Sequence, residues 1–362
     1  MLNLNARLVD EALVKQVIQD SGIPHGDIYA TRSREDASTA ARDIIDGGYD
    51  VVAVVGGDGT IVGAIEALAE EGERRGEGGV KGLPVIAYLP MGTGNGLGGV
   101  VGYKVGRFKK RKSIAKGLRL LKSSHTSTSI KTVPVPLLSV TYKGAPSSSS
   151  SNLCFFCGCG FDAVMLNDFI TIKKWARKTG ILTGPLSSIP GYCAALAFKT
   201  LPKGVRRIHE LKVRVTAPIS QDTTWIDHRR GDFATNVGGG VVFEGTTGIL
   251  AAATVPFYGG GMKLFPFARM GREGMHLRLG RMSPVVGAVN IPGVFKGWYR
   301  DKKTQRIVDF RGEEFDVEFL GEGEKPVQHS GEGVGGKTGF NVKTVGDVEF
   351  WDWEEDRVVI DE

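Results

Sequence analysis

Hydrophobic residues in the first third of the chain occur in short unbroken runs, and stretches with helical spacing lie between them. The runs 51–55 (VVAVV) and 85–89 (VIAYL) are too short for helices and do not alternate with polar residues. Such runs are typical of strands that are buried on both faces of a parallel sheet. The predicted helices, in which apolar residues recur at helical spacing, cover residues 11–18, 37–45, 61–69 and 114–121.

Beyond about residue 130 the pattern changes to segments in which apolar and polar residues alternate, as in half-buried strands. These segments cover residues 137–142, 211–216, 275–279 and 315–319. We therefore predict an α/β domain over residues 1–130 and a mainly β domain over residues 131–362. Two domains also agree with the usual expectation for a chain of 362 residues.

Two stretches with helical character interrupt the β pattern, at residues 167–178 and 191–198. The second stretch is strongly apolar. It either lines a pocket for an acyl chain or forms an ordinary packed helix, and the sequence leaves both interpretations open.

A glycine-rich turn, Gly56-Gly57-Asp58-Gly59-Thr60, directly follows the first predicted strand. Glycines at this position let the backbone turn sharply and approach a ligand without a Cβ in the way. Thr60 is predicted to cap the helix that follows, and amides at a helix start attract anions. Asp58 would repel a phosphate, so it indicates a metal or a proton-transfer role, unless it is an ordinary surface residue of a turn.

A second glycine turn, Gly92-Thr93-Gly94-Asn95, follows the second predicted strand. Gly94, Gly96 and Gly99 also match a Gly-x-Gly-x-x-Gly pattern, but the acidic residue expected about 20 positions later in a dinucleotide site is absent. Two turns of this size at strand ends predict a bound nucleotide.

The two glycine turns together resemble the diacylglycerol kinase catalytic domain, a family of lipid kinases that includes bacterial diacylglycerol kinases, sphingosine kinases and ceramide kinases. Further segments similar to motifs of that family are spread over nearly the whole chain. They are Asn5-Ala6-Arg7, Thr31, Gly158-Cys159-Gly160-Phe161-Asp162-Ala163, Pro266 to Gly274, and Val327-Gln328-His329-Ser330-Gly331-Glu332.

The resemblance implies a three-layer α/β nucleotide-binding domain followed by a mainly antiparallel β-sandwich domain that binds the lipid substrate. It implies an ATP- and Mg²⁺-dependent lipid kinase that phosphorylates a hydroxyl of diacylglycerol or of a sphingoid lipid. The implied nucleotide-binding residues are Asn5, Thr31, Gly56, Gly57, Asp58, Gly59, Thr60, Gly92, Thr93, Gly94 and Asn95.

The acidic residues expected in this family are only partly present. Ser330 stands where the family usually has Asp, Glu273 stands in place of another Asp, and Gly96 replaces an acid of many bacterial members. A serine cannot act as the base that accepts the hydroxyl proton. Asp58 is therefore our first candidate for that base. Glu332 then serves magnesium or the donor phosphate, is itself the base, or is a residue of a surface turn.

Two other functions stay open at this point. An NAD kinase shares Gly-Gly-Asp-Gly-Thr and a related two-domain layout, although its Asn-Glu-Asp type motif has no clear match. A degenerate family member would bind nucleotide or lipid without turnover, as Ser330 and Glu273 suggest. No Walker lysine follows either glycine turn, the histidines do not show the spacing of a zinc site, and the sequence does not identify metal ligands.

Positive charge is concentrated in two clusters within a chain of net charge +6 and pI near 9.0. The clusters lie at residues 104–112 and 173–178. Each either contacts anionic lipid headgroups or forms a solvated face. Nucleic acid is a poorer match because neither cluster contains interleaved stacking aromatics. Together with the lipid substrate that the resemblance implies, the first interpretation places the protein at an anionic membrane surface, with peripheral association.

Three of the four cysteines lie close together, at positions 154, 157 and 159. We predict buried thiols in a strand, with Cys154 and Cys157 on opposite sides, rather than a metal site. Free thiols suit a reducing compartment. No apolar run reaches the roughly 18–20 residues of a membrane span, and the first residues do not resemble a signal peptide. The sequence therefore predicts a cytoplasmic location.

Overall fold

The computed structural model shows two compact units. Of the described residues, the first unit contains those in 1–135 and 346–354, and the second contains those in 136–345. The structure describes residues 1–5, 15, 19, 21–91, 96–103, 110–124, 130–144, 151–180, 191, 194–200, 202, 210–228, 233–258, 262–270, 274–281, 290, 293, 297 and 306–354.

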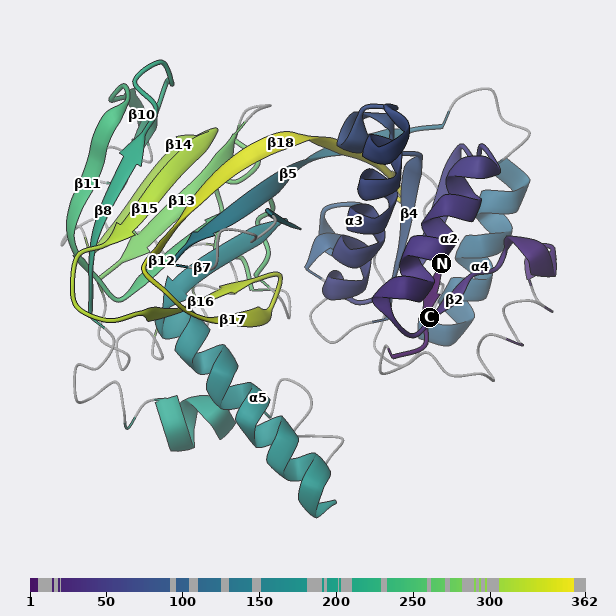
Figure 1. Ribbon diagram of the computed structural model, residues 1–362, viewed down its shortest axis with the longest axis horizontal. Coiled ribbons are helices and arrows are strands. Elements are labelled where there is room, and N and C mark those ends of the chain that lie inside the picture. The colour runs from purple at the N-terminus through teal and green to yellow at the C-terminus, as the bar shows by residue number, and fades with distance from the viewer. Residues whose placement is uncertain are drawn as a thin grey trace. The chain divides into compact units, whose positions relative to one another are not determined.

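The first unit is built on a parallel sheet with the strand order β18-β4-β3-β1-β2 (Figure 1). Its strands are β1 (Leu2–Asn3), β2 (Ala30–Thr31), β3 (Val51–Gly56), β4 (Val85–Pro90) and the end of β18 (Gly339–Trp351). Its helices are α2 (Arg34–Asp46), α3 (Asp58–Arg75) and α4 (Lys110–Ser124), with short 3-10 turns at His25–Asp27, Gly79–Gly82 and Leu97–Gly99. The predicted helix at 11–18 falls almost entirely outside the described residues.

Both faces of this sheet are covered by helices. The side chains of Tyr88 and Leu89, which point to opposite faces of β4, are fully buried. Tyr88 reaches the start of α3, and a Cβ placed on Gly117 of α4 would lie 2.8 Å from a methyl group of Leu89. Helix, sheet and helix therefore form the three layers of the predicted α/β domain.

The second unit contains two sheets in which the registered strand pairs are antiparallel. One sheet has β11 (Gly240–Thr247), β8 (Leu211–Ala217), β15 (Glu314–Phe319) and β18 in this order, with β5 (Thr132–Lys143) paired to β18 and to β6 (Asn152–Cys154). The other has the order β10 (Phe233–Asn236), β9 (Thr224–Asp227), β14 (Ile307–Gly312), β13 (Met275–Gly280), β12 (Ile249–Ala253), β7 (Phe156–Gly160), β16 (Lys325–His329) and β17 (Glu332–Lys337). Helix α5 (Phe161–Thr179) and a π-helix, η4 (Leu196–Thr200), complete this unit.

One apolar core lies between these two sheets, so the second unit is the predicted β-sandwich. Val215 and Phe315 from the first sheet and Leu277 from the second are fully buried members of this core. Alternate residues of each strand face it, as the period of two in the sequence predicts. Among the described helices none is long and apolar enough to cross a membrane.

The cysteines belong to the core of the sandwich. Cys154, Cys157 and Cys159 are buried free thiols. The expected opposite orientation of Cys154 and Cys157 is not found, because β6 and β7 lie in different sheets and the chain changes sheets at Phe155. Both thiols consequently face the same core.

The last strand connects the two units along the chain. Gly339 to Lys343 at the start of β18 pair with β15, whereas Phe350 near its end pairs in parallel with Ile86 of β4. Residues 346–354 therefore belong to the first unit, although a division at residue 130 places them in the second domain. No local signal in the sequence marks this return.

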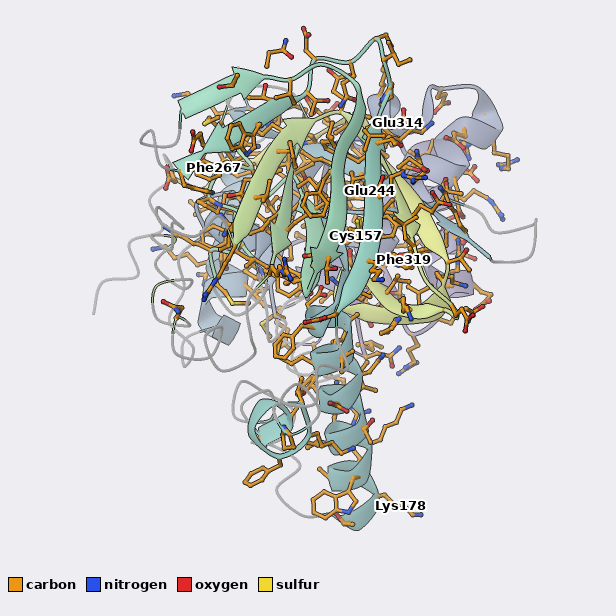
Figure 2. The ribbon with its side chains drawn as sticks, turned by 90° about the vertical axis from the view of Figure 1, so that its left-hand side faces the viewer. Cys157, Lys178, Glu244, Phe267, Glu314 and Phe319 are labelled. Atoms are coloured by element: carbon orange, nitrogen blue, oxygen red, sulfur yellow. The ribbon has the colours of Figure 1, made fainter. Side chains whose placement is uncertain are left out.

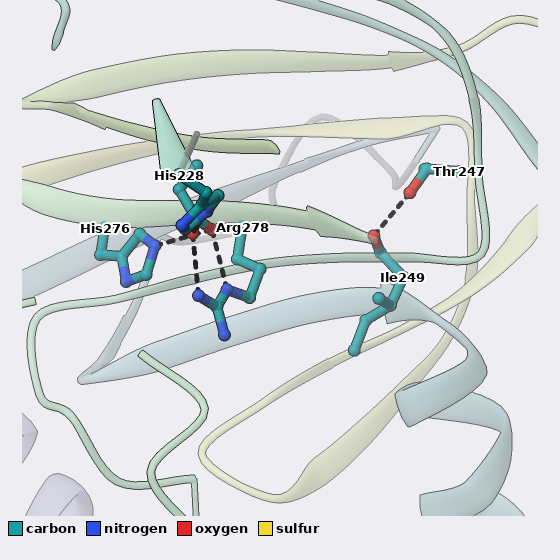
Figure 3. Close-up of polar contacts among 6 residues, drawn as sticks. His228, Thr247, Ile249, His276 and Arg278 are labelled. Atoms are coloured by element: carbon teal, nitrogen blue, oxygen red, sulfur yellow. Dashed lines mark hydrogen bonds and ion pairs between the residues drawn. The ribbon is translucent and has the colours of Figure 1, made fainter. Parts of the chain in front are cut away.

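A buried cluster of charged and polar groups lies on the face of the second sheet that points away from the core (Figure 3). Asp309 on β14 accepts two hydrogen bonds from the guanidinium of Arg278, both 2.8 Å long. His228 Nε2 lies 2.8 Å from Asp309 Oδ2, and His276 Nε2 lies 2.9 Å from Asp309 Oδ1. Burial alone would raise the pKa of Asp309, but Arg278 and His276 together hold it well below its ordinary value.

We expect Asp309→Ala to lower the free energy of unfolding by about 3–5 kcal/mol, because it leaves the buried charge of Arg278 without its partner. Urea unfolding at neutral pH measures this loss. The matched control is Asp316→Ala, which removes a partner of Lys143 from a pair whose side chains are 38% and 40% exposed. That change should cost less than about 1 kcal/mol. Equal losses for the two variants would contradict a structural role for the cluster.

Candidate active site

The carboxyl ends of β1, β2, β3 and β4 meet at one edge of the sheet in the first unit, because these strands are parallel. Ligands of open α/β sheets bind at this edge. Asn5, Thr31 and the turn Gly56–Thr60 all lie there, so the structure brings these predicted nucleotide-binding residues together. Gly92, Thr93, Gly94 and Asn95 lie outside the described residues.

The turn Gly56–Thr60 joins β3 directly to α3. Gly57 is the residue before the helix and Asp58 is its first residue, so the helix begins earlier than the predicted cap at Thr60. Thr60 instead lies inside the first helical turn, where its hydroxyl accepts hydrogen bonds from Gly57 N at 3.3 Å and from Asn3 Nδ2 at 2.9 Å. A Cβ on Gly56 would lie 2.5 Å from the Thr60 side chain. Close packing against Thr60 therefore requires glycine at position 56.

Asp58 links this turn to the segment that follows the second glycine turn. Its Oδ2 accepts a hydrogen bond of 3.1 Å from Gly96 N, and its Oδ1 accepts a hydrogen bond of 3.4 Å from the hydroxyl of Tyr88. Burial of Tyr88, together with the nearby charge of Asp58, raises the pKa of this tyrosine well above its ordinary value. Tyr88 therefore stays protonated and donates to the carboxylate, which fixes the orientation of Asp58.

Asn5 and Thr31 make contacts within the edge itself. The Asn5 side chain donates to the carbonyl of Arg32, and the buried hydroxyl of Thr31 donates to the carbonyl of Leu2 at 3.4 Å. Asp36 accepts hydrogen bonds from the amides of Arg32 and Ser33 at 2.7 and 3.2 Å. These bonds hold the ends of β1 and β2 next to the start of α2.

The other predicted acid, Glu332, lies in the second unit at the start of β17. It pairs with His329 across a two-residue turn formed by Ser330 and Gly331, and its side chain is exposed. Both turn residues have positive φ, +49° and +79°, as a type I′ hairpin requires. Ser330 is the only non-glycine residue with positive φ in the described part of the chain. Its hydroxyl oxygen is buried without a hydrogen-bond partner among the described groups.

A network of buried hydrogen bonds connects this turn to Asp162 and Tyr258. Gln328 donates from Nε2 to Asp162 Oδ2 at 3.2 Å and to the hydroxyl oxygen of Tyr258 at 2.7 Å, and it accepts a hydrogen bond of 3.2 Å from Gly331 N. Tyr258 in turn donates to Asp162 Oδ2 at 2.8 Å. Asp162 Oδ1 is buried without a hydrogen-bond partner among the described groups. Burial raises the pKa of Asp162 to about 6, although the bonds from Tyr258 and Gln328 oppose this shift.

His329 lies beside this turn. Its Nδ1 lies 2.7 Å from the hydroxyl of Tyr142, and the two rings are stacked. Burial lowers the pKa of His329, while the charge of Glu332 opposes this effect. The imidazole is therefore neutral at neutral pH, which leaves Glu332 without a cationic partner at this position of the hairpin.

Several of these residues were not identified from the sequence. Asn3 was given no role, Tyr88 lies within an apolar run and was assigned to a strand alone, and Gln328 and Asp162 were noted only as parts of motifs. A polar residue at the end of a strand, such as Asn3, is a usable signal for an active-site edge. The contact between Tyr258 and Asp162 spans 96 positions of the chain, and no local pattern reveals it.

The described residues contain no group of three or more His, Cys, Asp or Glu side chains that could hold a metal ion. Glu273 lies outside the described residues. Mg²⁺ usually binds through one or two carboxylates together with substrate phosphates, so single acids such as Asp58 or Glu332 fit a metal that arrives with a nucleotide better than a resident metal.

Residues 6–127 match the model of the diacylglycerol kinase catalytic domain family. The resemblance to that family is confirmed for this segment. No match was found among curated protein sequences. A solved diacylglycerol kinase structure from Bacillus anthracis str. Sterne covers 97% of this chain and 94% of its own, with a TM-score of 0.55 and 15% identity. A second structure assigned as a diacylglycerol kinase from this strain covers 95% and 92%, with a TM-score of 0.59 and 15% identity. At this identity the likeness shows a shared fold across both units.

We expect Asp162→Asn to stabilise the protein more as the pH rises. The pKa of Asp162 is raised from 3.8 to about 6 in the fold, so the folded state binds its proton more tightly than the unfolded state does. The stability contributed by Asp162 is therefore present at low pH and is lost as the pH rises through 6. Urea unfolding should show the variant to be more stable by about 3 kcal/mol at pH 8. The gain should vanish near pH 4, and a variant that is less stable at every pH would contradict this assignment.

We expect Ser330→Gly and Ser330→Asn to raise the free energy of unfolding by about 0.5–1 kcal/mol, because both residues adopt positive φ more readily than serine. Ser330→Val should destabilise the protein, since a β-branched residue is strongly disfavoured at this backbone angle. The midpoint of urea unfolding measures each change. A stabilising valine, or a destabilising glycine, would contradict the turn conformation described above.

Proposed function

We propose that this protein is an ATP-dependent lipid kinase that transfers the γ-phosphate to a hydroxyl of diacylglycerol or of a sphingoid lipid. The observation that carries the proposal is the position of Gly56–Thr60 within the segment that matches the diacylglycerol kinase catalytic domain. This turn lies where the strands of the first unit end and where α3 begins, which is the usual place for a phosphate in an α/β sheet.

The nucleotide is assigned to the edge formed by Asn5, Thr31 and the turn Gly56–Thr60, together with Gly92–Asn95 as the sequence predicts. Gly56 and Gly57 let a triphosphate approach the backbone, and the start of α3 supplies amides with a partial positive charge. The lipid acceptor is assigned to the β-sandwich unit.

Asp58 is assigned as the base that accepts the proton of the lipid hydroxyl. Gly96 N and the hydroxyl of Tyr88 hold its carboxylate at a fixed angle. A positioned base typically contributes a factor of about 10²–10⁴ to the rate of such a reaction.

Glu332 is assigned to Mg²⁺ or to the donor phosphate. Its carboxylate is exposed at the tip of a hairpin, and the neighbouring His329 is neutral. When bound, Mg²⁺ neutralises charge on the transferring phosphate. Ser330 occupies the position at which many relatives carry a second acid. This substitution supports one further candidate, a protein that binds nucleotide or lipid with little or no turnover.

The direct test is a phosphorylation assay with radiolabelled ATP and Mg²⁺, in which diacylglycerol, sphingosine and NAD are offered separately. We expect label in one of the lipid classes and none in NAD. Label in NAD alone would show that the protein is an NAD kinase. Nucleotide binding without any transfer would support the degenerate member, and recovery of transfer in Ser330→Asp would trace the defect to the missing acid.

Asp58→Asn separates the role of a base from that of a structural anchor. Asparagine can still accept the hydrogen bond from Gly96 but cannot take up a proton. We therefore expect kcat to fall by about 10²–10⁴ with little change in the KM for ATP. Tyr88→Phe is the control, because it removes one hydrogen bond and leaves the carboxylate. If Asp58→Asn raises the KM for ATP at unchanged kcat, Asp58 is an anchor and the base is another residue.

A further inference from the structure

Helix α5 extends beyond the sheets of the second unit (Figure 1). Its first turns contact β7, β16 and β17, and Asn167 lies against Gly333 of the β17 strand. Figure 2 shows Lys178 at the far end of the helix, away from the sandwich. Lys178 lies eleven positions after Asn167, which corresponds to about 16 Å of helix beyond the contact with β17.

The π-helix η4 packs against this extension and makes it a two-helix element. The hydroxyl of Thr200 donates a buried hydrogen bond of 3.0 Å to Asp168. Leu166 and Phe169 of α5 form a small apolar cluster with Ala195, which directly precedes η4. We call α5 and η4 together the α5–η4 element.

Two aromatic side chains of the α5–η4 element are exposed. Trp175 is 52% exposed and Phe198 is 81% exposed. Among the described residues they are the only strongly exposed Trp, Tyr or Phe side chains. Large aromatic rings are normally buried on folding, and at membrane interfaces they insert at the level of the lipid headgroups.

The charged residues that flank these two aromatics in the sequence are all basic. Lys174, Arg177 and Lys178 are exposed on the last turns of α5. No acidic residue occurs between Asp168 and Glu210. The basic residues of that interval are Lys173, Lys174, Arg177, Lys178, Lys199, Lys203, Arg206 and Arg207. Exposed aromatics surrounded by lysine and arginine are the composition of elements that bind at the interface of anionic bilayers.

We propose that the α5–η4 element docks the protein on an anionic membrane surface, with Trp175 and Phe198 inserted among the headgroups and Lys174, Arg177 and Lys178 against the lipid phosphates. This inference rests on the proposed function, because a lipid kinase must reach an acceptor held in a bilayer. It adds the docking element and the residues that carry binding. It also explains why the cationic cluster at the end of α5 has no acidic neighbours in sequence.

The test is binding of the full chain to phosphatidylcholine vesicles with and without phosphatidylserine, measured by sedimentation in the absence of ATP. We expect binding only to the anionic vesicles. The triple variant K174Q/R177Q/K178Q should lower the affinity by about 100-fold at low salt, since each basic residue near the surface contributes about a factor of five. The double variant W175S/F198S should lower it by about tenfold or more.

Matched controls separate docking from general effects of charge and hydrophobicity. K81Q/K212Q/R281Q removes three exposed cations elsewhere, and Ile219→Ser removes an apolar side chain that is 91% exposed. Both should retain most of the affinity. Brominated lipid should quench the emission of Trp175, and Trp175→Phe should abolish this quenching while binding is retained. Trp351 and Trp353 are buried and should contribute little to it.

Four results would overturn the proposal, and the first three concern binding. They are wild-type protein that does not bind anionic vesicles, variants of α5 and η4 that bind as well as the wild type, and a single-stranded RNA that binds this cluster more tightly than the vesicles do. A shift from dimer to monomer in W175S/F198S would show that a second copy covers the aromatics, and it would overturn the proposal as well.

Activity on a monomeric short-chain diacylglycerol distinguishes this inference from the proposed function. K174Q/R177Q/K178Q should phosphorylate that soluble acceptor at the wild-type rate and lose activity only on vesicles. If the wild type binds vesicles through these residues but phosphorylates no lipid, docking stands and the kinase assignment fails.

Discussion

The parallel arrangement of β1 to β4 is the constraint on which the rest of the first unit depends. Parallel strands place all their carboxyl ends at one edge, and each end continues into a turn whose backbone groups are not used by the sheet. At this edge Asp58 accepts hydrogen bonds from Gly96 N and from Tyr88. One carboxylate thereby joins the start of α3, the strand β4 and the segment after the second glycine turn.

On one face of one sheet, the second unit contains two buried carboxylates, Asp309 and Asp162, whose pKa values are shifted in opposite directions. Cross-strand pairing places Gln328, Gly158, Ala251, Arg278 and Asp309 in a single row across β16, β7, β12, β13 and β14. At one end of the row Asp309 is compensated by Arg278 and two histidines, and its pKa is low. At the other end Asp162, held by Gln328, has a raised pKa and an oxygen without a described partner.

This contrast indicates different roles for the two ends of the row. Asp309 is paired with Arg278 and with two histidines, so a structural role in holding β14, β13 and the end of β9 together accounts for it. A buried carboxylate whose pKa is near 6 costs stability at neutral pH, and such groups cluster at functional sites. Through Gln328, Asp162 is connected to the turn that carries Glu332. The raised pKa of Asp162 therefore agrees with a functional site near Glu332.

Local patterns in the sequence predicted the parts of the structure that depend on local interactions. The strands at 51–55 and 85–89 follow from unbroken apolar runs, and Gly56 follows from the need for a sharp turn beside Thr60. The predicted opposite orientation of Cys154 and Cys157 was wrong because the chain changes sheets at Phe155. This change depends on strand partners that lie far away in the chain.

Other contacts were out of reach of local patterns for the same reason. The return of β18 to pair with β4 and the network of Asp162 with Tyr258 each join residues that are widely separated in the chain. The helix begins at Asp58 rather than after Thr60, and the Thr60 hydroxyl accepts a hydrogen bond from Asn3, which lies 57 positions earlier in the chain. Short motifs could identify the candidate residues, but only the fold shows the hydrogen bonds that fix their positions.

The central claim is that a nucleotide binds at the carboxyl edge of the first unit. Protein labelled with ¹⁵N-glycine, titrated with Mg²⁺–ATP and followed by amide NMR, tests this claim most directly. The account predicts that the amide resonances of Gly56, Gly57, Gly59 and Gly96 shift together and saturate with one affinity, and that those of Gly240 and Gly245 on β11 stay in place. Unchanged resonances at Gly56–Gly59, with saturable shifts confined to glycines of the β-sandwich, would contradict it.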